Sequence, residues 1–252
     1  MKADCFTFLA MISPFSMRYS SGACLGALVA ALYLLPMRAG ALEVGGGCGS
    51  IGGSFLYDYR PEKFKPGGGV TSTAQARKLL EDAHFTRVVE TLQRGQSSRT
   101  PGGDISYLLQ RMPNHYRALL SMVALGKKEG TPQPFESAYS IDCWFKRAVA
   151  FSPDDNTVRM LYAQYLFNAS RTREAEYQLE TASSQAGQNP FTHFNIGLIY
   201  FDAKNYARAL AHARITYSIG FANLTLKEKL AEVGQWSEIS PAKPEDAASN
   251  PD

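Results

Sequence analysis

The second half of the chain is similar to itself when it is shifted by thirty-four residues, and this period limits the fold more than any other feature of the sequence. Residues 156–189 then coincide with residues 190–223, and the large residue Leu166 falls on Tyr200. A period of this length is typical of repeated pairs of helices, in which each pair buries its apolar face only against the next pair.

Small residues also coincide under this shift. Ala163 falls on Gly197, and Ala175 falls on Ala209. Two helices can cross closely only where both carry small side chains, because a larger one would hold their backbones apart. We therefore expect the first helix of each pair to cross its partner at Ala163 and Gly197.

The repeated pattern resembles the tetratricopeptide repeat, a pair of antiparallel helices. The resemblance covers about residues 113–221 and comprises two good copies and one copy with a loop inserted around 126–135. The position where this family usually has Trp is occupied by Arg159 and His193. The best copy carries the residues that match the family, namely Ile196-Gly197, Tyr200, Asn205-Tyr206 and Ala209.

The predicted fold is all-α: a short helix-turn-helix (tetratricopeptide-like) solenoid with a glycine-rich N-terminal arm and a C-terminal capping helix. Capping-box spacing marks helix starts at Ser72 with Gln75 and at Thr225 with Glu228. The predicted organisation is a signal peptide (1–41), an arm (42–71), N-terminal helices (72–112), repeats (113–221), a capping helix (222–236) and a disordered tail (237–252).

Three further expectations concern local structure. The apolar face that begins after Ser72 is expected to continue to Gly95, and the helix that contains Leu119 is expected to stop at Gly126. The arm carries seven glycines between Gly40 and Gly53. Because glycine loses much backbone entropy on ordering, this segment is expected to form neither helix nor strand.

An apolar run of about thirteen residues, Ala23–Leu35, lies near the N-terminus. It is shorter than the roughly 20 residues of a membrane-spanning helix. Arg18 precedes it and Ala39-Gly40-Ala41 follows, which is the pattern of a secretory signal peptide. We expect an exported protein, periplasmic if bacterial, that touches a membrane only if this segment stays uncleaved.

Cleavage after the signal would leave two cysteines, Cys48 and Cys143. Two cysteines in an oxidising compartment often form a disulfide, which here would attach the arm to the helices. The alternative is that Cys143 is a small buried helix residue and Cys48 is free. The sequence leaves both open.

Charge and motifs exclude several classes of function. The net charge is +3 without a basic cluster, so no nucleic acid is expected as a partner. The four histidines, His84, His115, His193 and His212, lack metal-ligand spacing, although His193 and His212 could approach each other. We find no nucleophile motif and expect no cofactor and no enzymatic activity.

The resemblance to the tetratricopeptide family implies a groove, lined by the first helix of each copy, that holds a peptide or a partner protein. Amides there could bond a peptide backbone and aromatic rings could anchor side chains, although Phe167 and Phe201 could equally pack between repeats. The implied groove residues are Met160, Gln164, Phe167, Asn168, Phe194, Asn195, Leu198, Phe201 and Asp202.

Two other functions stay open. One is a cell-envelope enzyme, or enzyme subunit, with a site between the arm and the helices near Asp58, His84 and His115. The other is self-association through an end helix. Stretches such as Pro113–Leu119 also resemble uncharacterised exported bacterial proteins with a short tetratricopeptide region, from which only compartment and fold can be inferred.

Overall fold

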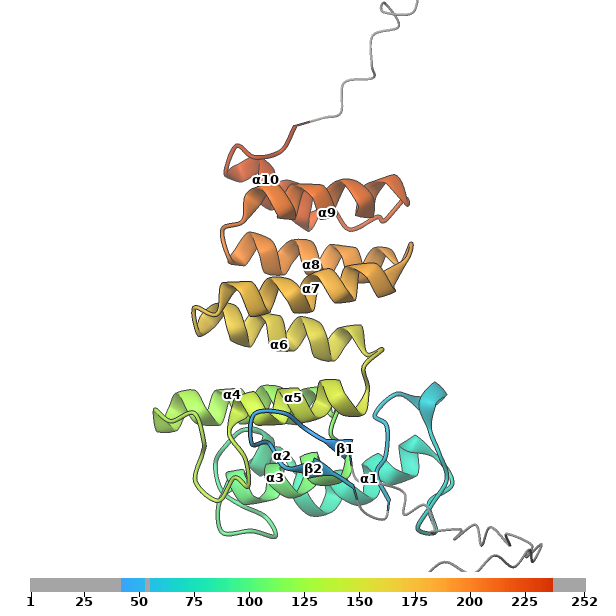
Figure 1. Ribbon diagram of the computed structural model, residues 1–252, viewed down its shortest axis with the longest axis vertical. Helices are drawn as coiled ribbons and strands as arrows, with labels where there is room; N and C mark the ends of the chain where they lie inside the picture. Colours follow the sequence, from blue (N-terminus) through green and yellow to red (C-terminus); the bar gives the residue numbers. More distant parts are fainter. Residues whose placement is uncertain (1–41, 53–54, 238–252) are drawn as a thin grey trace, which may run out of the picture. The chain divides into compact units, whose positions relative to one another are not determined.

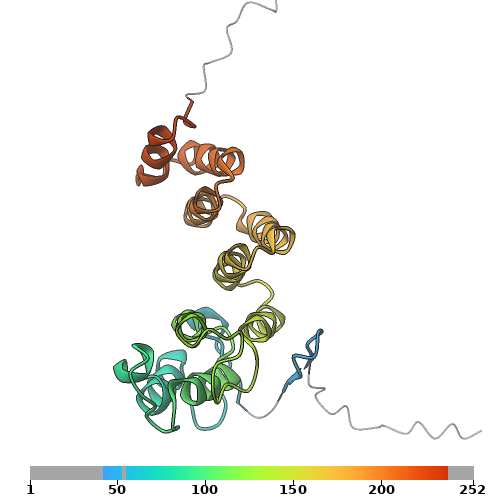
Figure 2. The same cartoon turned by 90° about the vertical axis from the view of Figure 1, so that its left-hand side faces the viewer.

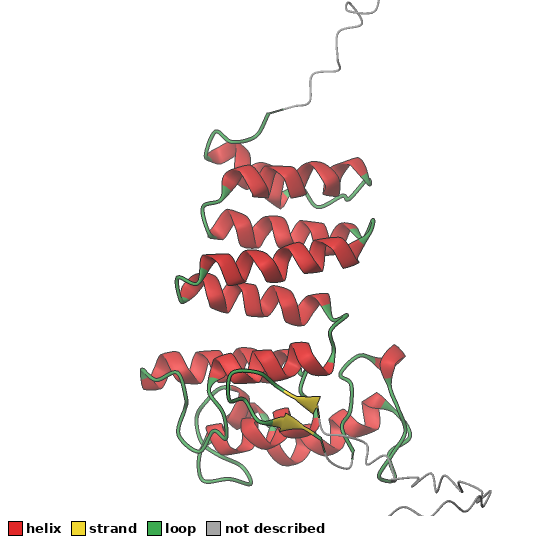
Figure 3. Ribbon diagram, in the orientation of Figure 1, coloured by secondary structure: helices red, strands yellow, loops and turns green. Residues whose placement is uncertain are grey.

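The computed structural model describes residues 42–52 and 55–237. All described residues belong to one compact unit. The predicted signal peptide and nearly all of the predicted tail lie outside the described residues. The described part is all-α apart from one very small sheet (Figures 1 and 3). None of its helices combines the length and the apolar character that crossing a membrane requires.

In chain order, the secondary structure of the described residues is β1 (Leu42–Glu43), β2 (Ser50–Ile51), a 3-10 turn (Pro61–Lys63), α1 (Thr73–His84), α2 (Arg87–Glu90), α3 (Pro101–Arg111), α4 (Tyr116–Glu129), α5 (Ile141–Phe151), α6 (Asn156–Asn168), α7 (Thr172–Ala186), α8 (Pro190–Asp202), α9 (Tyr206–Ser218) and α10 (Thr225–Glu232).

Helices α6 to α9 follow the thirty-four-residue period closely. Both ends of α8 lie thirty-four positions after those of α6, and α9 begins thirty-four positions after α7. The turns inside the two pairs also correspond, because each holds one residue in the left-handed conformation, Ser170 with φ 59° and Lys204 with φ 60°. The period of the sequence is therefore also a period of the backbone.

The helix starts repeat as well. Asp155, Asn189 and Asn223 stand thirty-four positions apart, and each accepts a hydrogen bond from a backbone N–H in the first turn of α6, α8 or α10. Such caps satisfy N–H groups that lack a partner within the helix. The capping box predicted at Thr225 and Glu228 is wrong, because the side chain of Asn223 accepts from the Thr225 N–H instead.

Successive helices pack in order along the chain. The most extensive contacts are those of α6 with α7 and of α8 with α9, and further contacts join α4 to α6, α6 to α8, and α8 to α10 (Figure 2). One apolar core runs through these helices and includes the fully buried side chains of Trp144, Leu166, Leu179 and Tyr200.

Small residues lie at the close approaches between helices. A Cβ added to Gly197 would stand 2.4 Å from Cδ2 of Leu226 in α10 and 3.4 Å from Cβ of His212 in α9. Ala163, Ala175 and Ala209, the other small residues of the period, are fully buried. At Gly197, therefore, a small residue is required by α10 as well as by α9.

Two predicted helix boundaries are wrong. The apolar face expected to continue to Gly95 is split, because α1 ends at His84 and Phe85 leaves the helical conformation before α2 begins. The helix expected to stop at Gly126 continues to Glu129 and ends at Gly130, which has φ 67°. Gly126 instead gives room to α5, since a Cβ there would lie 2.3 Å from Cδ1 of Ile141.

The prediction that the arm contains no strand is also wrong. Strands β1 and β2 form a small antiparallel sheet in which Leu42 pairs with Ile51. The turn between them holds Gly46, Gly47 and Gly49, whose φ angles of 66° to 75° favour glycine. The glycines thus form the turn of this hairpin. Contacts between the hairpin and α5 offset the backbone entropy that the glycines lose on ordering.

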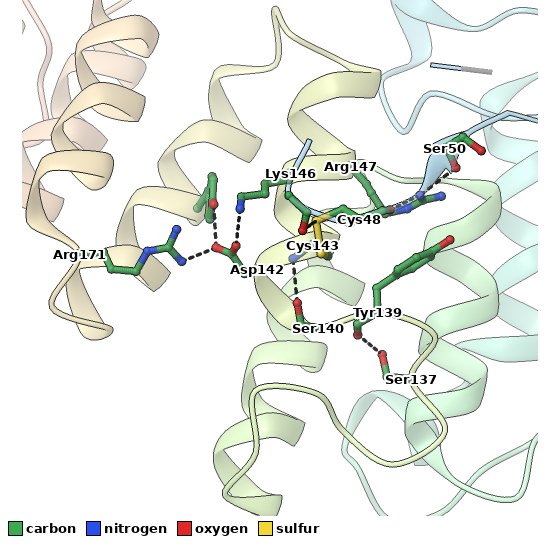
Figure 4. Close-up of a disulfide and its surroundings, with 12 residues drawn as sticks. Cys48, Ser50, Ser137, Tyr139, Ser140, Asp142, Cys143, Lys146, Arg147 and Arg171 are labelled. Carbon is green, nitrogen blue, oxygen red and sulfur yellow. Dashed lines mark hydrogen bonds and ion pairs between the residues drawn. A yellow bond between two sulfur atoms is a disulfide. The ribbon is translucent and has the colours of Figure 1, made fainter. Parts of the chain in front are cut away.

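A disulfide joins the arm to α5 (Figure 4). The Sγ atoms of Cys48 and Cys143 are 2.06 Å apart and their Cα atoms are 5.1 Å apart. The buried guanidinium of Arg147, one turn further along α5, donates hydrogen bonds of 2.9 Å to the carbonyl oxygens of Cys48 and Ser50. The arm is therefore held by one covalent link and two hydrogen bonds.

Candidate functional site

Two adjoining hollows lie on the face formed by α6 and α8. One has a volume of about 370 Å³ and the other of about 390 Å³. Gln164, Ile199 and Asp202 line both hollows, so the two form one continuous groove along these helices. We call this feature the α6–α8 groove.

Most of the predicted groove residues line these hollows. Met160, Asn195 and Leu198 line the first, and Phe167 and Asn168 line the second. The two residues that line both, Gln164 and Asp202, were also predicted. These positions come together because α6 and α8 pack side by side thirty-four residues apart, so equivalent positions share a face.

Phe194 and Phe201 do not line either hollow. The ring of Phe194 packs 5.0 Å from that of Phe221, which follows α9. The ring of Phe201 packs 5.3 Å from Tyr206, and the ammonium of Lys229 lies 5.2 Å over its centre. Both rings therefore serve the packing between consecutive helices, whereas Phe167, which is 6.1 Å from the Tyr200 ring, also faces the second hollow.

The polar ends in the groove are open to a ligand. Within the described part of the chain, the side chains of Gln164, Asn168 and Asp202 make no hydrogen bond or ion pair, and Gln164 and Asp202 are exposed. The amide of Asn195 donates 2.9 Å to the carbonyl of Phe191, which leaves its oxygen able to accept. Such amides can pair with the N–H and C=O groups of an extended backbone.

Among the described residues that line the two hollows, Asp202 is the single charged one. It is shared by both, so any ligand that extends along the groove passes its carboxylate. An isolated carboxylate at such a position favours a cationic group on the ligand.

The two central histidines form a pair, as their positions suggested. Their Nδ1 atoms are 3.2 Å apart, and Nε2 of His193 donates 2.9 Å to the carbonyl of Gly187. Because that bond places the proton of His193 on Nε2, the Nδ1–H of His212 donates to His193. Burial, followed by the charge of His193, lowers the pKa of His212 to about 4.

The pair occupies a position that repeats along the chain. Thirty-four residues earlier, Arg159 donates 2.8 Å to the amide oxygen of Gln178 and also binds the carbonyl of Pro153. Each pair thus ties the first helix of a copy to its second helix and to the preceding turn. Among residues 42–52 and 55–237 there is no group of three His, Cys, Asp or Glu side chains placed to hold a metal ion.

The residues of the alternative enzyme site belong to separate networks. Nδ1 of His84 lies 2.9 Å from the fully buried Asp104, which also accepts from three backbone N–H groups of residues 96–98. His115 caps α4 and lies 2.8 Å from Glu81. Asp58 is bound by neither histidine, so within the described residues Asp58, His84 and His115 do not form one site.

Asp58 instead belongs to a polar network that the sequence analysis missed. The buried amide of Asn114 donates to Asp58 at 2.8 Å and to Asp155 at 3.0 Å. Burial raises the pKa of Asp58, but hydrogen bonds from Arg60 and Asn114 prevail and hold it below its usual value. Burial raises the pKa of Asp155 despite the bonds from Asn114 and Tyr116. The network joins the arm to the starts of α4 and α6.

The spacing of these residues in the sequence did not predict this polar network. Asn114 stands directly before a helix, where an amide usually serves as a cap. In the structure His115 is the cap, and Asn114 bridges two carboxylates from distant segments.

Comparison of the chain with protein-family models, with curated proteins and with solved structures gives no match.

Proposed function

We propose that this chain is an exported, non-enzymatic interaction scaffold of tetratricopeptide-like repeats, and that it binds an extended segment of a partner protein in the α6–α8 groove. One observation carries the proposal. Two adjoining hollows on equivalent helices expose unpaired amides between apolar side chains. An extended peptide needs this combination, because its backbone requires hydrogen bonds and its side chains require apolar contact.

The repeat assignment is supported by three regularities of the backbone and side chains. Helix bounds, N-caps and the turn residues Ser170 and Lys204 recur at the same interval. The polar pairs Arg159–Gln178 and His193–His212 recur at that interval too. A solenoid of such pairs would present its first helices on one continuous face.

Export is supported by the N-terminal apolar run and by the disulfide. Disulfides such as that between Cys48 and Cys143 form and persist in oxidising compartments and are rare in the reducing cytosol. If the proposal holds, Cys48 and Cys143 have no free thiol in protein that is purified without reductant. A thiol assay under denaturing conditions, before and after reduction, measures this directly.

The groove is tested by replacing its three amide side chains. Gln164→Ala, Asn168→Ala and Asn195→Ala together remove the groups that would bind a peptide backbone. A control, Gln96→Ala with Gln188→Ala, removes two exposed amides that line neither hollow of the groove. Both proteins are used to select from a displayed library of random peptides, with wild type as reference.

The expected result is that wild type and control enrich a common family of peptides and that the groove variant does not. Equal enrichment by the groove variant would remove the groove from the proposal. Circular dichroism of each protein keeps a loss of binding distinct from a loss of folding. The alternative of an envelope enzyme is favoured by no contact in the structure, because Asp58, His84 and His115 lie in different networks.

A further inference from the structure

Apart from the two hollows of the α6–α8 groove, a further hollow lies between the arm, α5 and α7. It has a volume of about 550 Å³, within the range of small-molecule sites. Val149, Ala150 and Tyr162 line it from the helices, and Val44 lines it from the arm. It shares no lining residue with the α6–α8 groove, so it is a separate feature of the molecule.

The arm is a fixed wall of this hollow. The disulfide from Cys48 and the hydrogen bonds from Arg147 hold the hairpin on α5 (Figure 4). Within the hairpin, the Val44 N–H donates 3.0 Å to the Gly49 carbonyl. A hollow with fixed walls costs a ligand little ordering entropy, which favours binding.

Two side chains that line the hollow are not needed for helix packing. Arg173 and Tyr177 stand one turn apart on α7, and Tyr177 is 62% exposed. The positions thirty-four residues later on α9 are Ala207 and Ala211. Since α9 packs against α8 as extensively as α7 packs against α6, alanine satisfies the packing at both positions. Arg173 and Tyr177 therefore call for another explanation.

Two of the four described charged residues that line the hollow are paired. Lys146 lies 2.8 Å from Asp142, and Glu174 lies 2.6 Å from Arg171. Within the described part of the chain, the guanidinium of Arg173 has no carboxylate or hydrogen-bond acceptor as a partner.

Glu43 also lines the hollow without a partner in the described residues, but it stands on the arm. The unpaired cation thus shares one helix face with an exposed aromatic ring, beside an apolar floor.

We propose that this hollow binds a small amphipathic anion, with its apolar body on Val149, Ala150 and the Tyr177 ring and its anionic group on Arg173. The guanidinium can donate two parallel hydrogen bonds to a carboxylate or sulfonate. The proposal is independent of peptide binding in the α6–α8 groove.

The test uses the full oxidised chain and dodecanoate below its micelle concentration, with binding measured by calorimetry. The variant Arg173→Ala with Tyr177→Ala introduces the residues that α9 already carries, so it is expected to keep the fold. The matched control, Leu79→Ala with Arg87→Ala, removes an exposed apolar side chain and an exposed arginine from other helices. Dodecyltrimethylammonium, with the same chain and the opposite charge, serves as the second ligand.

Wild type and control are expected to bind dodecanoate with equal affinity, and Arg173→Ala alone is expected to weaken binding about five- to tenfold. The double variant is expected to weaken it further, and dodecyltrimethylammonium is expected to bind wild type at least about fivefold more weakly than dodecanoate. Three outcomes would overturn the proposal: no binding of dodecanoate by wild type, undiminished binding by the double variant, or equal affinity for the two ligands.

Discussion

Nδ1 of His193 in α8 and Nδ1 of His212 in α9 lie 3.2 Å apart, thirty-four residues after Arg159 and Gln178, which make the equivalent contact in the preceding helix pair. The two pairs differ in one property. Arginine and glutamine keep their charge state at all ordinary pH values, whereas burial and the nearby positive charges lower the pKa of His212.

The histidine pair makes stability depend on pH. The folded pKa of His212 is about 4, lowered first by burial and then by the charges of His193 and Arg208, and the ring also stacks on Tyr200. The unfolded pKa is about 6.5. Between these values the unfolded state binds a proton that the folded state does not, so stability falls as pH drops from about 6.5 toward 4. We expect a loss of about 1–2 kcal/mol between pH 7.5 and 5 from this group.

Urea unfolding at both pH values measures the loss. His115, whose pKa burial also lowers, contributes in the same direction, so a variant must isolate the pair. His193→Arg with His212→Gln installs the residues of the preceding copy. It is expected to reduce the pH dependence by the stated amount, and an unchanged dependence would show that the pair is not responsible.

The disulfide is expected to stabilise the fold substantially. Cys48 and Cys143 are 95 residues apart in sequence, and closing so long a loop restricts the unfolded chain. Replacing both by Ser is expected to lower the free energy of unfolding by about 2–4 kcal/mol. Reductant should lower the stability of the wild type to that of the variant and leave the variant unchanged. Insensitivity of the wild type to reductant would contradict a stabilising bond.

Gly197→Ala is expected to cost about 1–3 kcal/mol of unfolding free energy, since its Cβ would overlap the fully buried Leu226 and force α10 to shift. Gly45→Ala is the control, because no heavy atom lies within 4 Å of its added Cβ. Thermal unfolding compares the two. Adding Leu226→Ala to Gly197→Ala should give a total cost below the sum of the single costs, and strict additivity would mean that the clash is absent.

Asp202 is expected to select basic peptides in the α6–α8 groove. Because it is the single charged side chain lining both hollows, Asp202→Lys should turn enrichment of Lys- or Arg-containing peptides into enrichment of acidic ones. Glu62→Lys makes the same change of net charge on the arm and should leave the selection as in wild type. A selection without charge preference in the wild type would refute this role while leaving the groove itself in place.

The sequence predicted helix pairs well where their signals are local. Ser72 begins a helix as its capping position indicated, and its side chain accepts a hydrogen bond from the Gln75 N–H. Prediction from the sequence failed where contact with a distant segment determines the local structure. Gly126 was expected to end a helix, but α4 continues past it. The glycine is needed there for another reason, because a side chain would overlap Ile141 of α5. Most of the groove residues could be predicted from the sequence, since equivalent positions of α6 and α8 share one face. Phe194 and Phe201 could not, because they pack on Phe221 and Tyr206, which follow α8 in the chain.

The amino-acid sequence by itself determined the all-α character and the thirty-four-residue interval, because side-chain size and capping groups repeat along the chain and act over a few residues. Only the tertiary structure decided what the arm does and which polar groups meet. The hairpin, its attachment to α5 and the bridging of Asp58 and Asp155 by Asn114 join segments far apart in the chain, and contacts over such separations leave no periodic trace in the sequence.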